Sequence, residues 1–241
     1  MNDEFSLELS RRIREGSVFI TGFHGIGFVG WIAVTHLIKI LKAEKIGYVI
    51  SQDLPPYAVL DKGRLSLPFE IFAAGRYVFF KSNLPIEPRQ ASRLTKKLAE
   101  WVVDESFKEA ILIGGLDSRL KGESGDFKVV STTAYAEKNS LRDWELLEDG
   151  LYIVGPLALL LNWFEIMDFP ALVVLPYANT ERVDPLAASI AVRFISEMYG
   201  LKIDVTELEA RAEELERELL EAKKRMEEAL EKERSTRLFY V

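Results

Sequence analysis

The sequence predicts a three-layer α/β/α domain followed by a long C-terminal helix. Three observations support this prediction. Strand-like and helix-like segments alternate over residues 17–200, at the spacing that is typical of α/β proteins. Two strand-like segments, predicted at 109–115 and 171–177, contain the continuously apolar stretches ILIGG and ALVVLP, as strands covered on both faces do. From residue 204 onward the pattern changes to a charged helix with one narrow apolar seam.

The first half of the domain begins with a short apolar strand at 17–21, after which a glycine-rich turn leads into a helix. A second strand is predicted at 45–51, and a proline-rich loop follows it. Residues 69–83 are predicted to form a pair of strands that turns at Gly75. Pro88 suits the first turn of a helix, where its missing amide proton costs nothing, so a helix is expected to start there.

The second half of the domain contains the two continuously apolar strands and a polar loop at 117–127 between them. A further strand is expected at 128–135. Residues 155–167 (GPLALLLNWFEIM) are mostly apolar, so this segment is predicted to be a buried helix. The last helix of the domain is predicted to start after the capping residue Asp184 and to stop at Gly200.

The C-terminal helix is predicted over 204–234, where Asp204 and Glu207 have the spacing of a capping box. Apolar residues then recur in steps of three and four, which places them in one seam of the coiled-coil type. The seam residues expected to mediate oligomerisation are Leu208, Ala212, Leu215, Leu219, Ala222 and Met226. So narrow a seam favours packing between subunits. Antiparallel pairs, a four-helix bundle and packing on the chain's own domain all stay open.

Composition and domain boundaries narrow the class of protein. The expected segments are an N-terminal segment (1–16), the core domain (17–203), the oligomerisation helix (204–234) and a flexible tail (235–241). The net charge of −7 argues against nucleic-acid binding, which needs excess lysine and arginine. The absence of cysteine excludes disulfides and thiolate metal sites. We recognise neither a signal peptide nor a membrane span, so a cytoplasmic protein is expected.

The strongest local motif is the glycine turn at 22–30, which reads GFHGIGFVG. Gly25, Gly27 and Gly30 match G-x-G-x-x-G between a strand and a helix, and Asp53 lies near the end of the next strand. In an NAD(P)-type enzyme such glycines admit the pyrophosphate, and the acid binds a ribose. The alternative, which we favour, is a tight turn that packs a helix closely on a strand without any cofactor.

A search for catalytic residues in the sequence gives no constellation. His24 and His36 are the two histidines, and they lack the spacing of a metal-binding pair. A G-x-S-x-G elbow is absent, and no nucleophile, base and oxyanion donor can be assembled. We therefore expect a protein that is not an enzyme, with no catalytic residue, no metal and no cofactor.

Several short motifs follow one another in a recognisable order. They are Phe28-Val29-Gly30 at the start of a helix, the Leu54-Pro55-Pro56 loop, ILIGG, GPLALLL, and Asp184-Pro185-Leu186-Ala187-Ala188 followed by GLKIDVTEL. In this order, over 17–208, the chain resembles the archaeal proteasome assembly chaperone family, which is related to eukaryotic proteasome assembly chaperone 2. The resemblance implies an α/β/α sandwich with a phosphorylase-like sheet and no established catalytic residues.

The last three residues, Phe239, Tyr240 and Val241, fit the pattern hydrophobic–Tyr–any residue (HbYX) at a C-terminus. The resemblance implies that this tail enters pockets between adjacent α subunits of the 20S proteasome. It also implies an ATP-independent assembly chaperone or activator that forms a homo-oligomer, with a tetramer among the expected forms. The competing hypotheses are a nucleotide-dependent enzyme and an oligomerisation module whose tail is buried.

Overall fold

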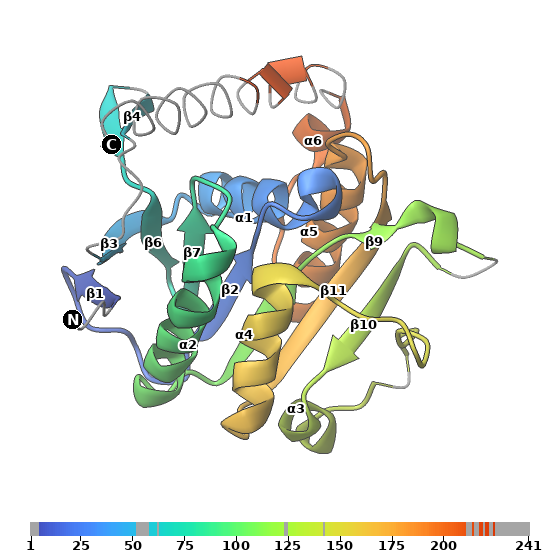
Figure 1. Cartoon of the computed structure of the whole chain (residues 1–241), viewed down its shortest axis with the longest axis horizontal. Helices are drawn as coiled ribbons and strands as arrows, with labels where there is room; N and C mark the ends of the chain where they lie inside the picture. Colours follow the sequence, from blue (N-terminus) through green and yellow to red (C-terminus); the bar gives the residue numbers. More distant parts are fainter. Residues whose placement is uncertain are drawn as a thin grey trace, which may run out of the picture.

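A computed structural model of the chain describes residues 5–51, 58–61, 63–122, 125–141 and 143–210, together with 214, 217, 218, 220, 221 and 224. It shows a central sheet with helices on both of its faces (Figure 1). The prediction of a mixed α/β fold built on a central sheet is confirmed at this level.

The main sheet is parallel at its centre and antiparallel at both sides. Its strands are β1 (Ser6–Leu9), β2 (Val18–Gly22), β3 (Glu44–Ile50), β6 (Phe69–Ala74), β7 (Tyr77–Ser82), β8 (Glu109–Ile113), β9 (Leu116–Asp117), β10 (Phe127–Ser131) and β11 (Ala171–Ala178). Their order is β1-β3-β6-β7-β2-β8-β11-β10, and β9 pairs with β11. The strands β7, β2, β8 and β11 run parallel. A separate hairpin consists of β4 (Val59–Asp61) and β5 (Arg64–Ser66).

Helices cover the two faces of this sheet in two layers. One layer contains α2 (Pro88–Asp104) and α4 (Gly155–Ile166), and the other contains α1 (Val29–Ile40) and α5 (Pro185–Tyr199) (Figure 1). The shorter α3 (Thr133–Lys138) follows β10, and α6 (Thr206–Ala210) packs beside α5. Within the described part of the chain, every helix is too short or too polar to cross a lipid bilayer.

The central strands β8 and β11 form where the sequence is almost continuously apolar, with Glu109 at the start of β8 as the charged exception. All residues of β8 and β11 are buried. Along β8, Ala110 and Leu112 enter the core beneath α2 and α4, whereas Ile111 and Ile113 enter the core beneath α1 and α5. A strand with no solvent-facing side needs this continuous pattern, so the sequence-based prediction of both strands is confirmed.

The limits of α5 follow from local chemistry, as predicted. The Oδ1 atom of Asp184 accepts a hydrogen bond from the amide of Ala187 at 3.0 Å, and Pro185 occupies the first turn. Gly200 ends the helix in the left-handed conformation, with φ of 63°. Gly75, between β6 and β7, has φ of 59°, which confirms the predicted turn.

Long-range contacts correct one prediction of secondary structure and add one strand that was not predicted. The strand expected at 128–135 stops at Ser131, because the hydroxyl of Thr132 donates to the carbonyl of Phe169 at 2.9 Å and α3 starts at the next residue. In addition, β1 forms inside the expected N-terminal segment 1–16, where it pairs antiparallel with β3 at the edge of the sheet.

The prediction that residues 155–167 form a buried helix is wrong as regards burial. Leu157, Leu160 and Phe164 of α4 face the core, but Ile166 is 71% exposed. The polar residues Asn162 and Glu165 are also exposed, and they are the signal in this mostly apolar segment that one side of the helix faces outward. The outward side of α4 carries Gly155, Asn162, Glu165 and Ile166, of which Ile166 alone is a large apolar residue.

Candidate functional site

The glycine turn lies where the carboxyl ends of three neighbouring strands meet. A Cβ atom on Gly22 would lie 2.5 Å from the Cα of Gly30, and a Cβ on Gly30 would lie 2.3 Å from the carbonyl oxygen of Ile113. A Cβ on Gly115 would lie 2.5 Å from the carbonyl oxygen of Ile26. Real Cβ atoms do not come so close to other atoms, so these glycines allow backbone to touch backbone.

The three glycines of the G-x-G-x-x-G motif have different surroundings. Gly27 has φ of 59°, and its carbonyl oxygen accepts a hydrogen bond from the amide of Asp184 at 2.8 Å. Gly30 packs against β2 and β8, whereas a Cβ on Gly25 would meet open space. Contacts within the chain thus account for two of the three glycines, which favours the packing interpretation over nucleotide binding. Asp53 lies outside the described residues.

His24 lies in the glycine turn and is shielded by aromatic rings. The centroid of its ring is 5.3 Å from the centroids of Phe28 and of Trp31. Burial, together with the nearby Lys81 ammonium group, lowers the pKa of His24 from 6.5 to about 3. A general base works best with a pKa near the operating pH, so His24 is poorly suited to that role.

Residues 204–210, which include α6 and lie where the C-terminal helix is predicted to start, are attached to both α1 and α5; we call this segment the helix base. Leu208 is 3% exposed and lies in the core cluster that these two helices form with the sheet. The Nε2 atom of His36 lies 2.8 Å from the carbonyl oxygen of Asp204 and donates to it. Hydrogen bonds from the side chain and the amide of Thr206 lower the pKa of Asp204. These contacts fix the position of α6 on the domain.

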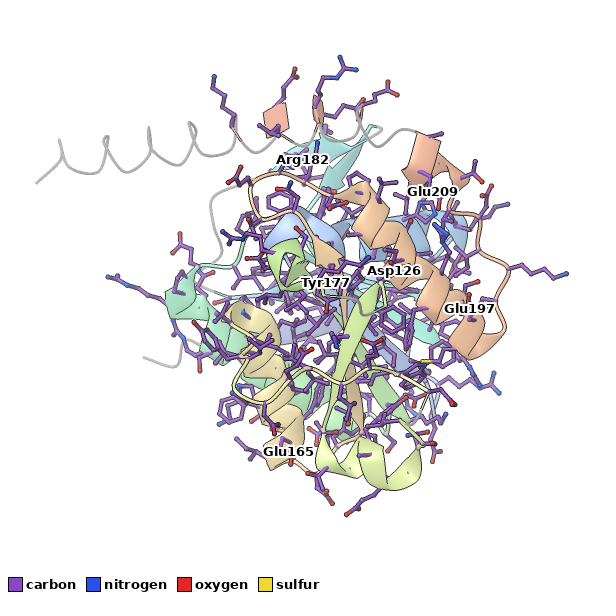
Figure 2. The ribbon with its side chains drawn as sticks, turned by 90° about the vertical axis from the view of Figure 1, so that its right-hand side faces the viewer. Asp126, Glu165, Tyr177, Arg182, Glu197 and Glu209 are labelled. Atoms are coloured by element: carbon purple, nitrogen blue, oxygen red, sulfur yellow. The ribbon has the colours of Figure 1, made fainter. Side chains whose placement is uncertain are left out.

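Two ion pairs hold the helix base on either side of Leu208. The Nζ atom of Lys39, on α1, lies 2.6 Å from both carboxylate oxygens of Glu207. On α5, Arg193 pairs with Glu209. Figure 2 labels Glu209, and it also labels Glu197, which lies farther along α5. The four side chains are between 38% and 52% exposed, so each pair stabilises the base only slightly.

The structure places one of the predicted seam residues, Leu208, in the core of its own chain. The remaining predicted site residues lie outside the described residues: Ala212, Leu215, Leu219, Ala222, Met226, Phe239, Tyr240 and Val241. Sequence reasoning missed the roles of His36, Lys39 and Arg193. The contact between His36 and Asp204 joins residues 168 positions apart, and no local pattern indicates such a pair.

The described residues contain no group of three or more His, Cys, Asp or Glu side chains that could hold a metal ion. The fold and the segment 204–210 together define a class of protein, an α/β/α domain with the short helix α6 attached to its α1 and α5 layer. The sequence model of the PAC2 family matches residues 19–223. The chain therefore belongs to the PAC2 family, which confirms the family resemblance seen in the sequence.

Relatives of known sequence or structure match over most of their length. The MJ1210 protein of Methanocaldococcus jannaschii is 25% identical over 223 residues, which cover 90% of this chain and 86% of the relative. The crystal structure of PbaA from Pyrococcus furiosus, described as an archaeal homolog of proteasome-assembly chaperone, matches with a TM-score of 0.81 at 27% identity, covering 93% of this chain and 99% of PbaA. PbaB of the same organism, described as an archaeal proteasome activator, matches with a TM-score of 0.72 at 23% identity, covering 92% and 99%.

Proposed function

We propose that this protein is a non-enzymatic, ATP-independent assembly chaperone or activator of the 20S proteasome. Membership of the PAC2 family supports this function. So does the likeness to PbaA, at 27% identity over nearly the whole of both chains. The likeness to PbaB supports the shared fold, because its identity of 23% is too low to carry a function.

The proposed binding element is the C-terminal tail of Phe239, Tyr240 and Val241, which would enter the crevices between adjacent α subunits. A terminal carboxylate is a recognised anchor for peptide binding. Phe239 would contribute about 1.5–3 kcal/mol of apolar burial, and Tyr240 would add a ring and a hydroxyl group that can form a directed hydrogen bond. Ordering a flexible tail opposes this gain, so a single tail would bind weakly.

The observation that carries this mechanism is the attachment of the helix base to α1 and α5. Leu208 is buried there, and His36 holds the carbonyl of Asp204, so the helix starts from a fixed place on the domain. If the helix continues over 204–234 as the sequence predicts, it extends for about 45 Å at 1.5 Å per residue. A helix of that length would hold the tail well away from the α/β/α domain.

Self-association would bring several tails together on one particle. We propose that the seam of Ala212, Leu215, Leu219, Ala222 and Met226 joins copies of the chain into a homo-oligomer. Leu208 would not take part, because it already anchors the helix base within its own chain. Linking several weak tails raises the overall affinity by about 10²–10⁴ when they can bind together.

The direct test compares the full-length chain with a version that ends at Leu238, by co-sedimentation with purified 20S proteasome. Full-length protein is expected to sediment with the proteasome, and the shortened chain is expected to remain in the supernatant. Circular dichroism and sedimentation velocity should show an unchanged fold and oligomer in both. The matched control is Leu238→Ala, which leaves the last three residues intact and should retain binding. Undiminished binding by the shortened chain would contradict the tail mechanism.

Two further variants separate the side-chain and carboxylate contributions of the tail. Tyr240→Ala should reduce binding strongly, because it removes both the ring and the hydroxyl group. One residue added after Val241 should also reduce binding, since it moves the terminal carboxylate away from its position. If the extended chain bound as well as the original, capture of the carboxylate would be excluded.

A further inference from the structure

The strand β10 lies at one edge of the main sheet, and the segment that joins α3 to α4 runs along its outer side (Figure 1). We call residues 143–153 of this segment the edge strap. Its backbone bonds to β10 centre on Val129. The amide of Val129 donates to the carbonyl of Glu145 at 2.9 Å, and the amide of Leu147 donates to the carbonyl of Val129 at 3.0 Å. The strap therefore covers backbone groups that an edge strand would otherwise offer to other chains.

The edge strap is anchored on both faces of the sheet. The ring of Trp144 lies 5.0 Å from that of Phe194, on the side of α1 and α5. Leu147 and Ile153 pack on the opposite core, beneath α2 and α4. Between these anchors, Leu146 is 53% exposed. A segment with few backbone bonds and part of its surface in water opens at a lower free energy than the central strands do.

A charged side chain of β10 connects the strand to the edge strap. The side chain of Lys128 is 8% exposed, and its Nζ atom lies 2.9 Å from Glu145 Oε2 and 2.8 Å from Glu148 Oε1. Glu145 also accepts a hydrogen bond from the amide of Gly125 at 3.0 Å. Tyr177 is the other titratable group that acts on Lys128. Two carboxylates of the strap thus neutralise one buried ammonium group.

We propose that the edge strap is a lid that opens as a unit, and that Lys128, Glu145 and Glu148 form the latch that keeps it closed. The two sides of this latch are unequal. The carboxylates of Glu145 and Glu148 are 47% and 55% exposed, so they can turn to water when Lys128 is lost. An ammonium group that loses both carboxylates stays buried and uncompensated, which is strongly destabilising. The strap then opens, because opening lets water reach Lys128.

Acid acts on this latch in the direction of opening. The amide of Gly125 and then Lys128 lower the pKa of Glu145, and Lys128 lowers the pKa of Glu148, from the usual value of 4.5. Carboxylates with a lowered pKa stabilise the closed strap above pH 4.5, and this contribution is lost as the pH falls through their folded values. An open strap leaves Val129 unpaired, so the latch also protects the sheet from edge-to-edge association.

Other carboxylates titrate in the same acidic range, so substitutions at neutral pH give the selective test. Glu145→Gln combined with Glu148→Gln, in the full-length chain, removes both anions and leaves the buried ammonium. Hydrogen exchange followed by mass spectrometry should show residues 143–153 exchanging at least about tenfold faster than in the unmodified chain. The amides of β8 should remain protected, which shows that the domain is still folded.

Addition of Lys128→Met to this double variant separates a charged latch from ordinary packing. With no charge left to bury, the triple variant should return to slow exchange in the strap. Lys128→Met alone should accelerate exchange less than the double variant does. The matched control is Lys121→Met, which removes the exposed pair of Lys121 with Asp126 and should leave exchange in the strap unchanged.

Two results would overturn the proposal. If the triple variant exchanged as fast as the double variant, the charge of Lys128 would not be the latch. If the strap of the unmodified chain exchanged as slowly as β8, it would open only with the whole molecule and would not be a separate lid. Either result would leave the proposed docking of the C-terminal tail untouched, because the strap takes no part in it.

Discussion

The helices α1 and α5 carry two junctions that are built in different ways. At their amino ends, the glycine turn brings backbone against backbone, and Gly22, Gly30 and Ile113 leave no space for even one additional carbon atom. Farther along the same helices, side chains hold the helix base, residues 204–210. Buried Leu208 and half-exposed ion pairs make this second junction. The first junction depends on close backbone contacts that no side chain can replace. The second depends on several side chains, so single substitutions can weaken it one contact at a time.

This difference shows where function is to be sought in the molecule. A glycine motif that binds nucleotides in other α/β proteins is here occupied largely by contacts within the chain. The second junction leads into the segment that ends with the proposed binding tail. The distinction between a packed turn and an adjustable attachment can be tested by substitutions of graded effect.

The largest expected effect is that of Gly30→Ala. The new Cβ would lie 2.3 Å from the carbonyl oxygen of Ile113, so strand and helix would have to separate. We expect a loss of at least about 3 kcal/mol in the free energy of unfolding, measured by chemical denaturation. Gly25→Ala is the control, because its Cβ meets open space, and its stability should change by less than about 1 kcal/mol. Similar losses in both variants would show that the turn is not the tight junction described.

The next effect is that of Leu208→Ala at the helix base. Removing a buried leucine side chain lowers the free energy of unfolding by about 2–5 kcal/mol when the neighbouring side chains cannot fill the cavity. The loss should appear as faster hydrogen exchange in α6, with the strands protected as before. Leu220→Ala serves as the control, since Leu220 is 51% exposed, and it should leave exchange in α6 unchanged. If both variants behaved alike, Leu208 would not be an anchor.

The effect of pH on His24 should be smaller. The pKa of His24 is about 3 in the folded chain and 6.5 when unperturbed. At pH 7 its ring is therefore mostly neutral in both the folded and the unfolded chain. Below about pH 6.5 the unfolded chain binds a proton that the folded chain refuses, and stability falls until the pH approaches the folded value. The loss between pH 7 and pH 5 is about 2 kcal/mol. Denaturation of His24→Gln should show a loss smaller by this amount, whereas parallel curves would contradict the low pKa.

The smallest effect is expected at the exposed ion pairs of the helix base. A double-mutant cycle of Lys39→Ala and Glu207→Ala should give a coupling of about 0.2–1 kcal/mol in the free energy of unfolding. The coupling should decrease in 1 M salt, where charges are screened beyond about 3 Å. A coupling that is large and independent of salt would mean that this pair, and not Leu208, holds the base.

Much of the fold could be predicted because its causes are local. The strands β8 and β11 are visible as continuous apolar runs, and Asp184 and Gly200 mark the ends of α5 by their capping chemistry. The remainder depends on distant partners. The strand β1 forms only because β3 is available for pairing, and β10 ends early because Thr132 bonds to Phe169.

The candidate site was predictable only in part for the same reason. The sequence shows that a glycine turn exists, but not whether its glycines meet a ligand or atoms such as the carbonyl oxygen of Ile113. An apolar period of three and four indicates a helix seam without naming its partner, and Leu208 proved to face its own domain. The exposure of Ile166 on α4 was likewise not predicted, because an apolar residue gives the same sequence pattern whether it is buried or exposed.

The most direct measurement is electron cryomicroscopy of the full-length protein mixed with 20S proteasome at saturating concentration. Density for Phe239, Tyr240 and Val241 is expected in the crevices between adjacent α subunits, with the terminal carboxylate of Val241 at the inner end. Empty crevices, while the protein is bound elsewhere or not at all, would contradict the proposed docking of the tail.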